Sequence, residues 1–223
     1  MGLGGYLCWT AAARELKKRL PPGVKVMPIE QHGQFIKTIK NNIFYNNEDI
    51  LQTWESSKFY FPMILNNPSS NYCKKDTPEK AVHRYDKHII EQYCEFYGID
   101  NPELKCKLNL DDKENEKVEN LVDGLSDFIT IDIGVNHNYN KNKFDNFKVW
   151  QEVVNKISKD ITVVQVGLKQ QILSSTINLT EKTTFREAAG IIGKSKLFVG
   201  SEGGLVHAAT AFNTRSVAIV TSF

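Results

Sequence analysis

Apolar and polar stretches alternate regularly in the second half of the sequence. Short apolar runs rich in β-branched residues end in a glycine or a polar loop, and the segments between them repeat apolar residues at helical spacing. The predicted strands cover 128–133, 161–166, 197–199 and 216–221, and the predicted helices cover 147–157, 184–192 and 205–212. Strands and helices that alternate in this way are typical of a doubly wound parallel sheet, so we expect an α/β fold.

The first half shows fewer clear elements. Apolar residues recur at helical spacing over 10–20, Pro21-Pro22-Gly23 ends this predicted helix, and 24–29 has the pattern of a short strand. A second helix is expected to begin at Asp76-Thr77-Pro78-Glu79, which offers a capping residue, a proline and an acid in order, and to end at Gly98. The stretch between that strand and this helix is weakly patterned.

The most polar part of the chain is DDKENEKVEN, residues 111–120. Such a charged stretch between two patterned regions favours a linker. We therefore expect an N-terminal domain over 1–122 and a C-terminal domain over 123–223.

Composition and charge exclude several classes of protein. The net charge is only +2, and no Lys/Arg cluster has interleaved aromatic residues, so nucleic acid is not an expected partner. The four cysteines form no C-x-x-C pair and the five histidines show no metal-ligand spacing, so we expect reduced thiols and no bound metal. The sequence contains no signal-peptide pattern and no apolar run of transmembrane length.

The most informative loop is GSEGGLVHAAT, residues 200–210, between a predicted strand and a predicted helix. Gly203 and Gly204 would let the backbone approach a ligand, and the N–H groups that open the helix would suit a phosphate. Glu202 beside them could accept ribose hydroxyls, and His207 could contact the anion. The alternative is a tight strand-to-helix turn whose glycines only permit close packing.

Two other loops carry weaker signals. Lys143 lies in the polar stretch 137–150 ahead of a predicted helix, where a lysine could reach a diphosphate; an ordinary surface lysine is the alternative. The opening GLGG, residues 2–5, is predicted as a glycine loop that leads into a helix. It does not match G-x-G-x-x-G and no strand leads into it, which disfavours a dinucleotide-dependent oxidoreductase.

Four stretches resemble, in order, those of one known family. They are GLGGYLCWTAAARELKKRLP (2–21), KFDNFKVWQEVVNKI (143–157), LTEKTTFREAAGIIGKSKLFVG (179–200) and GSEGGLVHAATAFNTRSVAIV (200–220). A fifth, AVHRYDKHIIEQYCEFYGI (81–99), is similar to the helix that closes the family's N-terminal half. The family is glycosyltransferase family 9, the heptosyltransferases of lipopolysaccharide assembly. The last of the four stretches is the most specific.

The resemblance implies a GT-B-like architecture, in which two Rossmann-like doubly wound domains hold an acceptor and a nucleotide-sugar. The implied reaction is the inverting transfer of a sugar, usually heptose from an ADP-sugar, with no cofactor and no metal ion. Matched position by position, the resemblance implies donor-binding roles for Lys143, Thr183, Ser201, Glu202, Gly203, Gly204 and His207. It also implies an acceptor-side loop that includes Gly4 and Gly5.

The sequence departs from the family pattern at the catalytic position. Gly5 stands where the family has its catalytic aspartate, and glycine cannot accept the proton of an acceptor hydroxyl. General base catalysis contributes about 10²–10⁴-fold to a rate, so a replacement base is needed. His32, just after the predicted strand 24–29, is a candidate base; a loop histidine bonded to nearby backbone is the alternative. Phe144-Asp145 also replaces the family's Trp-Pro.

Relative to the family, the chain is expected to lack the first strand and the C-terminal helices. The leading hypothesis is a glycosyltransferase that acts on lipopolysaccharide or surface polysaccharide. The alternative is a catalytically inactive nucleotide- or phosphate-binding module. The expected partners are a nucleotide-sugar donor and a glycan or lipid-linked glycan acceptor. The expected location is the cytoplasm, with at most peripheral contact at the inner face of the membrane.

Overall fold

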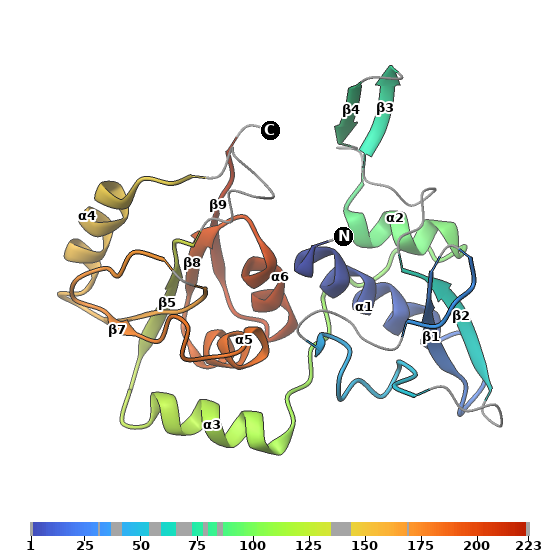
Figure 1. Ribbon diagram of the computed structural model, residues 1–223, viewed down its shortest axis with the longest axis horizontal. Helices are drawn as coiled ribbons and strands as arrows, with labels where there is room; N and C mark the ends of the chain where they lie inside the picture. Colours follow the sequence, from blue (N-terminus) through green and yellow to red (C-terminus); the bar gives the residue numbers. More distant parts are fainter. Residues whose placement is uncertain are drawn as a thin grey trace. The chain divides into compact units, whose positions relative to one another are not determined.

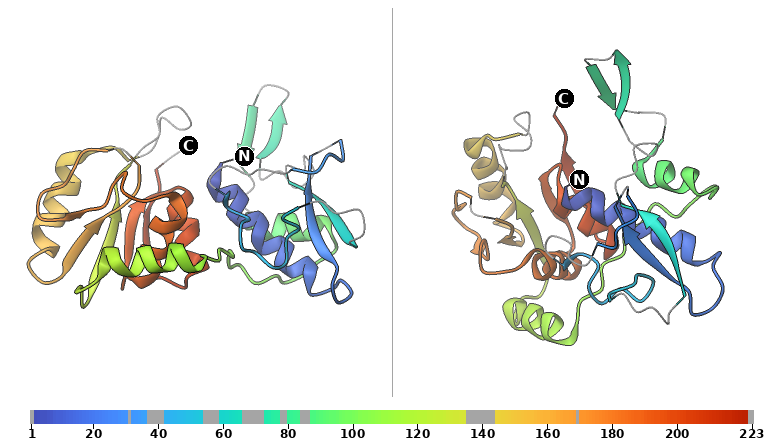
Figure 2. Two further views of the ribbon diagram at one scale, coloured as in Figure 1. Left: turned by 60° about the horizontal axis from the view of Figure 1, so that its bottom comes forward. Right: turned by 45° about the vertical axis from the view of Figure 1, so that its right-hand side comes forward.

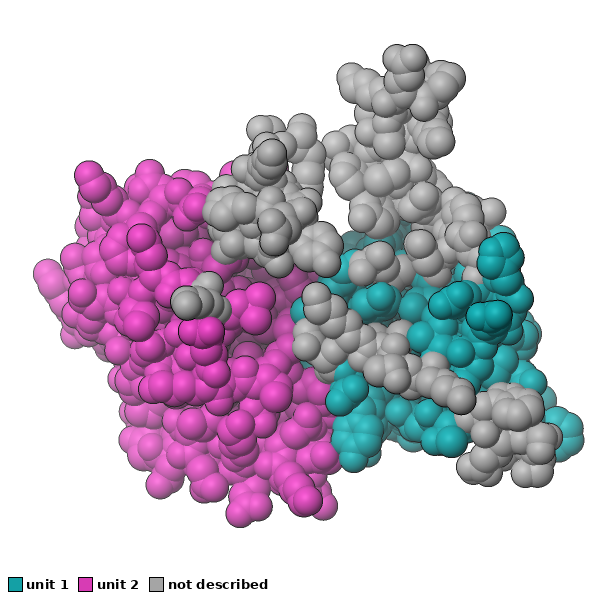
Figure 3. Space-filling model, in the orientation of Figure 1, with its two compact units in different colours: residues 1–109 teal, residues 110–223 magenta. Residues whose placement is uncertain are grey.

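The computed structural model divides the chain into two compact units, Met1–Asn109 and Leu110–Phe223, which Figure 3 colours separately. It describes residues 2–30, 32–36, 42–53, 59–65, 73–77, 80–83, 87–134, 144–168 and 170–221. The division falls earlier in the chain than the boundary predicted between 122 and 123. Both units combine helices with parallel strands, so the expected α/β class is confirmed.

The second unit contains a five-stranded sheet whose strands are all parallel (Figure 1). Its strands are β5 (Phe128–Asp132), β6 (Thr162–Gln165), β7 (Ile177–Asn178), β8 (Phe198–Ser201) and β9 (Ser216–Ile219). Their order across the sheet is β7-β6-β5-β8-β9. The sequence predicted β5, β6, β8 and β9, and the predicted doubly wound parallel sheet is confirmed.

Helices cover both faces of this sheet (Figures 1 and 2). They are α4 (Phe147–Ile157), α5 (Phe185–Lys194) and α6 (Gly204–Ala211), at the positions predicted from the apolar pattern. Trp150 and Val154 of α4 pack into a core with Ile129, Ile131 and Val163 from the strands. On the other face α5 packs against α6, so each crossover buries its apolar stripe on the sheet.

The segment predicted as a linker, 111–120, belongs instead to helix α3 (Asp112–Val122). Its amino end is closed by a capping box: the Asp111 carboxylate accepts from the Glu114 N–H (2.8 Å) and the Glu114 carboxylate accepts from the Asp111 N–H (2.9 Å). Val118 and Val122 are buried, one turn apart. The cap and this narrow apolar stripe suffice for a helix that packs against α5.

The first unit is arranged around helix α1 (Leu3–Lys17). Every residue from Leu7 to Ala13 is buried, so the middle of the helix is enclosed on all sides. Trp9 stacks on Phe44 with ring centroids 4.8 Å apart and donates its indole N–H to the Ile64 carbonyl oxygen (3.2 Å). Strands β1 (Lys25–Ile29) and β2 (Tyr60–Ile64) pair in parallel in this unit. The predicted strand 24–29 is thus confirmed, whereas β2 lies in the weakly patterned stretch.

The helix predicted from Asp76-Thr77-Pro78-Glu79 onward is confirmed only in its second half. The elements here are an antiparallel hairpin of β3 (Cys73–Thr77) and β4 (Lys80–His83), followed by α2 (Ile89–Phe96). The helix begins after His88 because His88 Nδ1 accepts from the Ile90 N–H (3.1 Å) and the Glu91 carboxylate accepts from the His88 N–H (2.7 Å). Gly98, with φ of +64°, follows its end as predicted.

Candidate functional site

The strand order of the second unit indicates where a ligand would bind. From β5 the chain moves to β6 and β7 on one side, and it then returns to β8 and β9 on the other. Asp132 at the end of β5 is the register partner of Gly200 in β8. In doubly wound sheets, ligands bind outside the carboxyl ends of the strands, where the order reverses. The reversal lies between β5 and β8.

Three helices begin at this carboxyl edge, and their amino ends differ. The Asn146 side chain caps α4, and Thr184 with Glu187 forms the predicted capping box of α5. The cap residue of α6 is Gly203, which makes no side-chain capping bond. The first N–H groups of a helix lack intrahelical acceptors and carry a partial positive charge. Of these three ends, the one at α6 is therefore open to an anion.

The turn that leads into α6 is held in place by the neighbouring backbone. Ser201 is buried and donates its hydroxyl hydrogen to the Phe144 carbonyl oxygen (3.2 Å), and the Glu202 N–H donates to the Ile219 carbonyl oxygen (3.0 Å). Gly200 is required for space, because a Cβ there would lie 2.9 Å from the Asp132 carbonyl oxygen. The turn therefore has a fixed backbone.

The structure brings most of the predicted donor residues to one edge. Glu202, Gly203, Gly204 and His207 are half-buried in the turn and in the first residues of α6. Thr183 directly precedes the cap of α5 at the same edge, and its hydroxyl oxygen is buried without a hydrogen-bond partner among the described residues. Their binding of a donor stays a prediction.

Two residues at this edge escaped the sequence analysis. The amide of Gln170, in the loop after β6, bonds both to the backbone and to Asp132 at the end of β5. The sequence offered two indirect signals, namely the glycines that follow the two strands, Gly134 and Gly167. The contacts that join Gln170 to Asp132 span distant parts of the chain and have no local motif.

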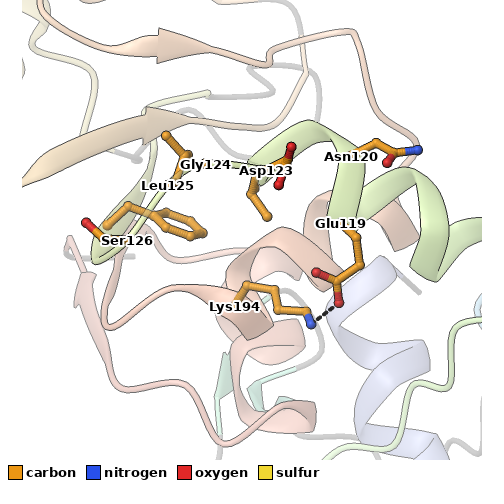
Figure 4. A pocket seen from close by; sticks show the side chains of 9 residues that line it. Glu119, Asn120, Asp123, Gly124, Leu125, Ser126 and Lys194 are labelled. Atoms are coloured by element: carbon orange, nitrogen blue, oxygen red, sulfur yellow. Dashed lines mark hydrogen bonds and ion pairs between the residues drawn. The ribbon is translucent and has the colours of Figure 1, made fainter.

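A separate pocket lies at the opposite, amino edge of the same sheet (Figure 4). Its lining comes from the end of α3, the start of β5 and the end of α5, and includes Glu119, Asp123 and Lys194. Lys194 and Glu119 form an ion pair across it. The pocket contains none of the predicted site residues, so we do not assign it to the donor.

The family of the chain follows from comparison with known proteins. Residues 54–222 match the model of glycosyltransferase family 9 (heptosyltransferase). The chain belongs to glycosyltransferase family 9. The match covers all of the second unit's sheet and the second half of the first unit, and no curated protein matches the sequence.

Solved structures of other family 9 proteins have the same fold. The structure is similar to E. coli ADP-heptose lipopolysaccharide heptosyltransferase II, with 14% identity, a TM-score of 0.64, and coverage of 97% of this chain and 81% of that one. The family 9 glycosyl transferase of Veillonella parvula is 13% identical, with a TM-score of 0.69 and coverage of 98% of this chain and 78% of that one. E. coli heptosyltransferase WaaC, solved with ADP, is 10% identical, with a TM-score of 0.60 and coverage of 98% of this chain and 84% of that one. The expected GT-B-like fold is confirmed.

The positions predicted to lie on the acceptor side of this family 9 chain differ from the expectation. Gly4 and Gly5 were expected in a loop, but they lie in the first turn of α1, which begins at Leu3. Glycine costs about 1 kcal/mol in a helix interior because its backbone loses more conformational freedom than that of other residues. The buried residues that follow then hold the helix in place.

Two predicted site residues remain, and the structure describes one of them. His32 is exposed in a turn after β1, where the Gly33 N–H donates to the Glu30 carbonyl oxygen (2.9 Å). Lys143 lies outside the described residues. Among the helices that the structure describes, none is long and apolar enough to cross a bilayer.

Proposed function

We propose that this family 9 chain transfers a sugar, with inversion, from a nucleotide-sugar resembling ADP-heptose to a lipopolysaccharide or surface polysaccharide acceptor. The observation that carries the proposal is the uncapped amino end of α6, which follows a fixed glycine turn at the point where the strand order reverses. One structural relative is named for ADP-heptose and another was solved with ADP. Both names favour an adenine nucleotide.

The donor diphosphate is proposed to lie at the amino end of α6. The helix supplies N–H donors and about half a positive charge, and Lys143 would add a full charge. Glu202, next to the turn, would accept the ribose hydroxyls rather than meet the phosphates. Because the helix end and Lys143 would then offset much of the diphosphate charge, we propose that the reaction needs no metal ion, and transfer should persist in EDTA.

The acceptor hydroxyl needs a base, and Gly5 cannot act as one. We propose His32 for this role, because an imidazole nitrogen can accept a proton and because this residue follows strand β1 at its carboxyl end. An acceptor attached to a lipid would bring the protein into peripheral contact with the inner face of the membrane.

The donor site can be tested by titration calorimetry with ADP, GDP, UDP and CMP. We expect ADP to bind, and Lys143→Ala to weaken binding about tenfold, which corresponds to the loss of one charge-assisted contact. Lys148→Ala is the matched control, because Lys148 is exposed on α4 and has no proposed role. Failure of all four nucleotides to bind would overturn the donor site.

Transfer itself is tested by release of ADP from ADP-heptose with a heptose-deficient glycolipid as acceptor. His32→Ala should lower kcat by about 10²-fold and leave the affinity for ADP unchanged. Undiminished transfer in this variant would eliminate His32 as the base.

The second candidate function is a nucleotide-binding module without transferase activity. Gly5 in place of the catalytic aspartate favours it. It predicts that the wild-type chain binds ADP but releases none from the sugar nucleotide, with or without an acceptor.

A further inference from the structure

One side chain of the second unit joins the loops that follow two adjacent strands. Gln170 Oε1 accepts from the backbone N–H of Ile133, just after β5 (3.0 Å). Its Nε2 lies 2.9 Å from the carbonyl oxygens of both Val166 and Leu168, which belong to its own loop after β6. The same nitrogen lies 3.2 Å from Asp132 Oδ1. Both ends of this amide are therefore engaged across the edge of the sheet.

The Asp132 carboxylate is the second member of this cluster. Its Oδ1 accepts from the Gly134 N–H (2.9 Å) as well as from Gln170. The surrounding backbone leaves no space for other side chains: a Cβ at Gly167 would lie 2.6 Å from Oδ1, and one at Gly134 would lie 3.0 Å from it. Gly167 also has φ of +108°, which favours glycine. Each residue of the cluster is thus restricted by the others.

The cluster lies beside the proposed donor site. Asp132 is the register partner of Gly200, so the end of β5 adjoins the strand that leads into the turn at 201–204.

We propose that Gln170 is a positioning residue for nucleotide binding, which joins residues 133–134, directly after β5, to the backbone after β6 and so presents a preformed edge to the donor. This role rests on the proposed function. Backbone groups that are already held in place lose less conformational entropy when the ligand binds, and small displacements of binding groups lower affinity steeply. In this proposal Asp132 acts through the hydrogen bonds that it accepts from Gly134 and Gln170.

The experiment measures the ADP affinity of the full chain by titration calorimetry. Gln170→Ala and Asp132→Ala should each weaken binding about tenfold. Asp132→Asn should stay within about twofold of wild type, because the amide oxygen of asparagine accepts the same two hydrogen bonds. In the transfer assay, Gln170→Ala should raise the KM for the donor and leave kcat unchanged.

The matched control is Gln151→Ala. Gln151 also joins its helix to a loop, since its side chain accepts from the Ser174 N–H (2.8 Å) and donates to the Ser174 carbonyl oxygen (3.3 Å), but it makes no contact with the Asp132 cluster. We expect this variant to bind ADP like wild type. Thermal melts of all variants show which of them fold; if Gln170→Ala does not, the comparison of Asp132→Ala with Asp132→Asn decides.

The outcomes separate this role from the proposed function. If wild type binds no nucleotide, the proposed function fails and this role falls with it. If wild type binds ADP and Gln170→Ala binds equally well, only the positioning role is overturned. If Asp132→Asn is as weak as Asp132→Ala, the negative charge of Asp132 is itself required, and positioning through these two hydrogen bonds is likewise overturned.

Discussion

At the scale of single residues, substitution of two glycines distinguishes the effect of backbone strain from the effect of steric crowding. Gly167 and Gly124 both have positive φ, but a Cβ at Gly167 would strike the Asp132 carboxylate, whereas nothing lies within 4 Å of one at Gly124. Gly124→Ala should lower the free energy of unfolding by about 1 kcal/mol, from strain alone. Gly167→Ala should lower it by a further ~1–3 kcal/mol. Urea titration measures both, and equal losses would contradict the crowding.

The thiol of Cys94 should be protected in the folded protein. Burial raises its pKa from 9.0 to about 12, and the negative charge of Glu15 adds to the effect. Because the thiolate is the reactive form, iodoacetamide at pH 8 should label Cys94 in urea and leave it unmodified without urea. Peptide mass spectrometry measures the labelling, and equal labelling in both conditions would refute the protection.

The same raised pKa links Cys94 to the pH dependence of stability. The contribution of the neutral Cys94 thiol to the free energy of unfolding is complete below pH 9.0. It is lost as the pH rises from 9.0 toward about 12, because the thiol ionises at a lower pH in the unfolded chain than in the folded one. The free energy of unfolding should therefore fall more steeply above pH 9 in wild type than in Cys94→Ala. If the free energy of unfolding of the two proteins fell equally with pH, Cys94 would not contribute to the pH dependence of stability.

At the scale of elements, three ion pairs of the described residues join α3 to α5, and two of them lie in different surroundings. Arg186, with a side chain 3% exposed, reaches Glu114 through Nε and a terminal nitrogen, both at 2.6 Å. Lys194 and Glu119 also pair, but their side chains are 47% and 60% exposed. Arg186→Ala should lower the free energy of unfolding by ~3–5 kcal/mol, because it leaves a partly buried carboxylate unpaired.

Lys194→Ala should change the stability by less than about 1 kcal/mol, as expected for an exposed pair. Chemical denaturation of the two variants provides the comparison. Similar losses in both would show that burial does not decide the strength of these pairs.

The capping patterns explain which elements the sequence predicted. Thr184 and Glu187 form a capping box ahead of an obvious apolar face, and the helix was predicted. Asp111 and Glu114 form the same box, but only Val118 and Val122 are buried in α3, so its polar composition suggested a linker. A helix was therefore predicted where a capping box stood next to a broad apolar face. It was missed where the apolar face was narrow.

The candidate site shows the same division between local and distant information. The turn and helix at 201–207 could be predicted, because their glycines and small residues are adjacent in the sequence. The role of Gln170 could not, because its partners Ile133 and Asp132 become neighbours only when β5 and β6 pair. His32 and Gly5 belong to the first unit, where the pattern was weakest.

At the scale of the whole molecule, the boundary between the two units falls between two successive residues, Asn109 and Leu110, whose side chains contact different units. Asn109 donates to the Asn46 carbonyl oxygen (3.0 Å) and the Glu48 carboxylate (2.9 Å) of the first unit. Leu110 lies instead beside Gly190 of α5, where an added Cβ would come within 2.5 Å of Leu110 Cδ1. Helix α3 therefore belongs with the second sheet, and the boundary expected at 122 would separate it from its partner α5.

Two fragments test this boundary. Residues 110–223 retain α3, so Arg186 keeps its Glu114 partner and Val118 still covers Gly190. In residues 123–223 both contacts are lost, so the Arg186 guanidinium loses its Glu114 partner and an apolar helix face is exposed to water. We expect 110–223 to unfold cooperatively, and 123–223 to be at least ~3–5 kcal/mol less stable, which is enough to unfold many domains of this size. Urea unfolding followed by circular dichroism distinguishes them, and equal midpoints would mean that α3 is dispensable, as a linker would be.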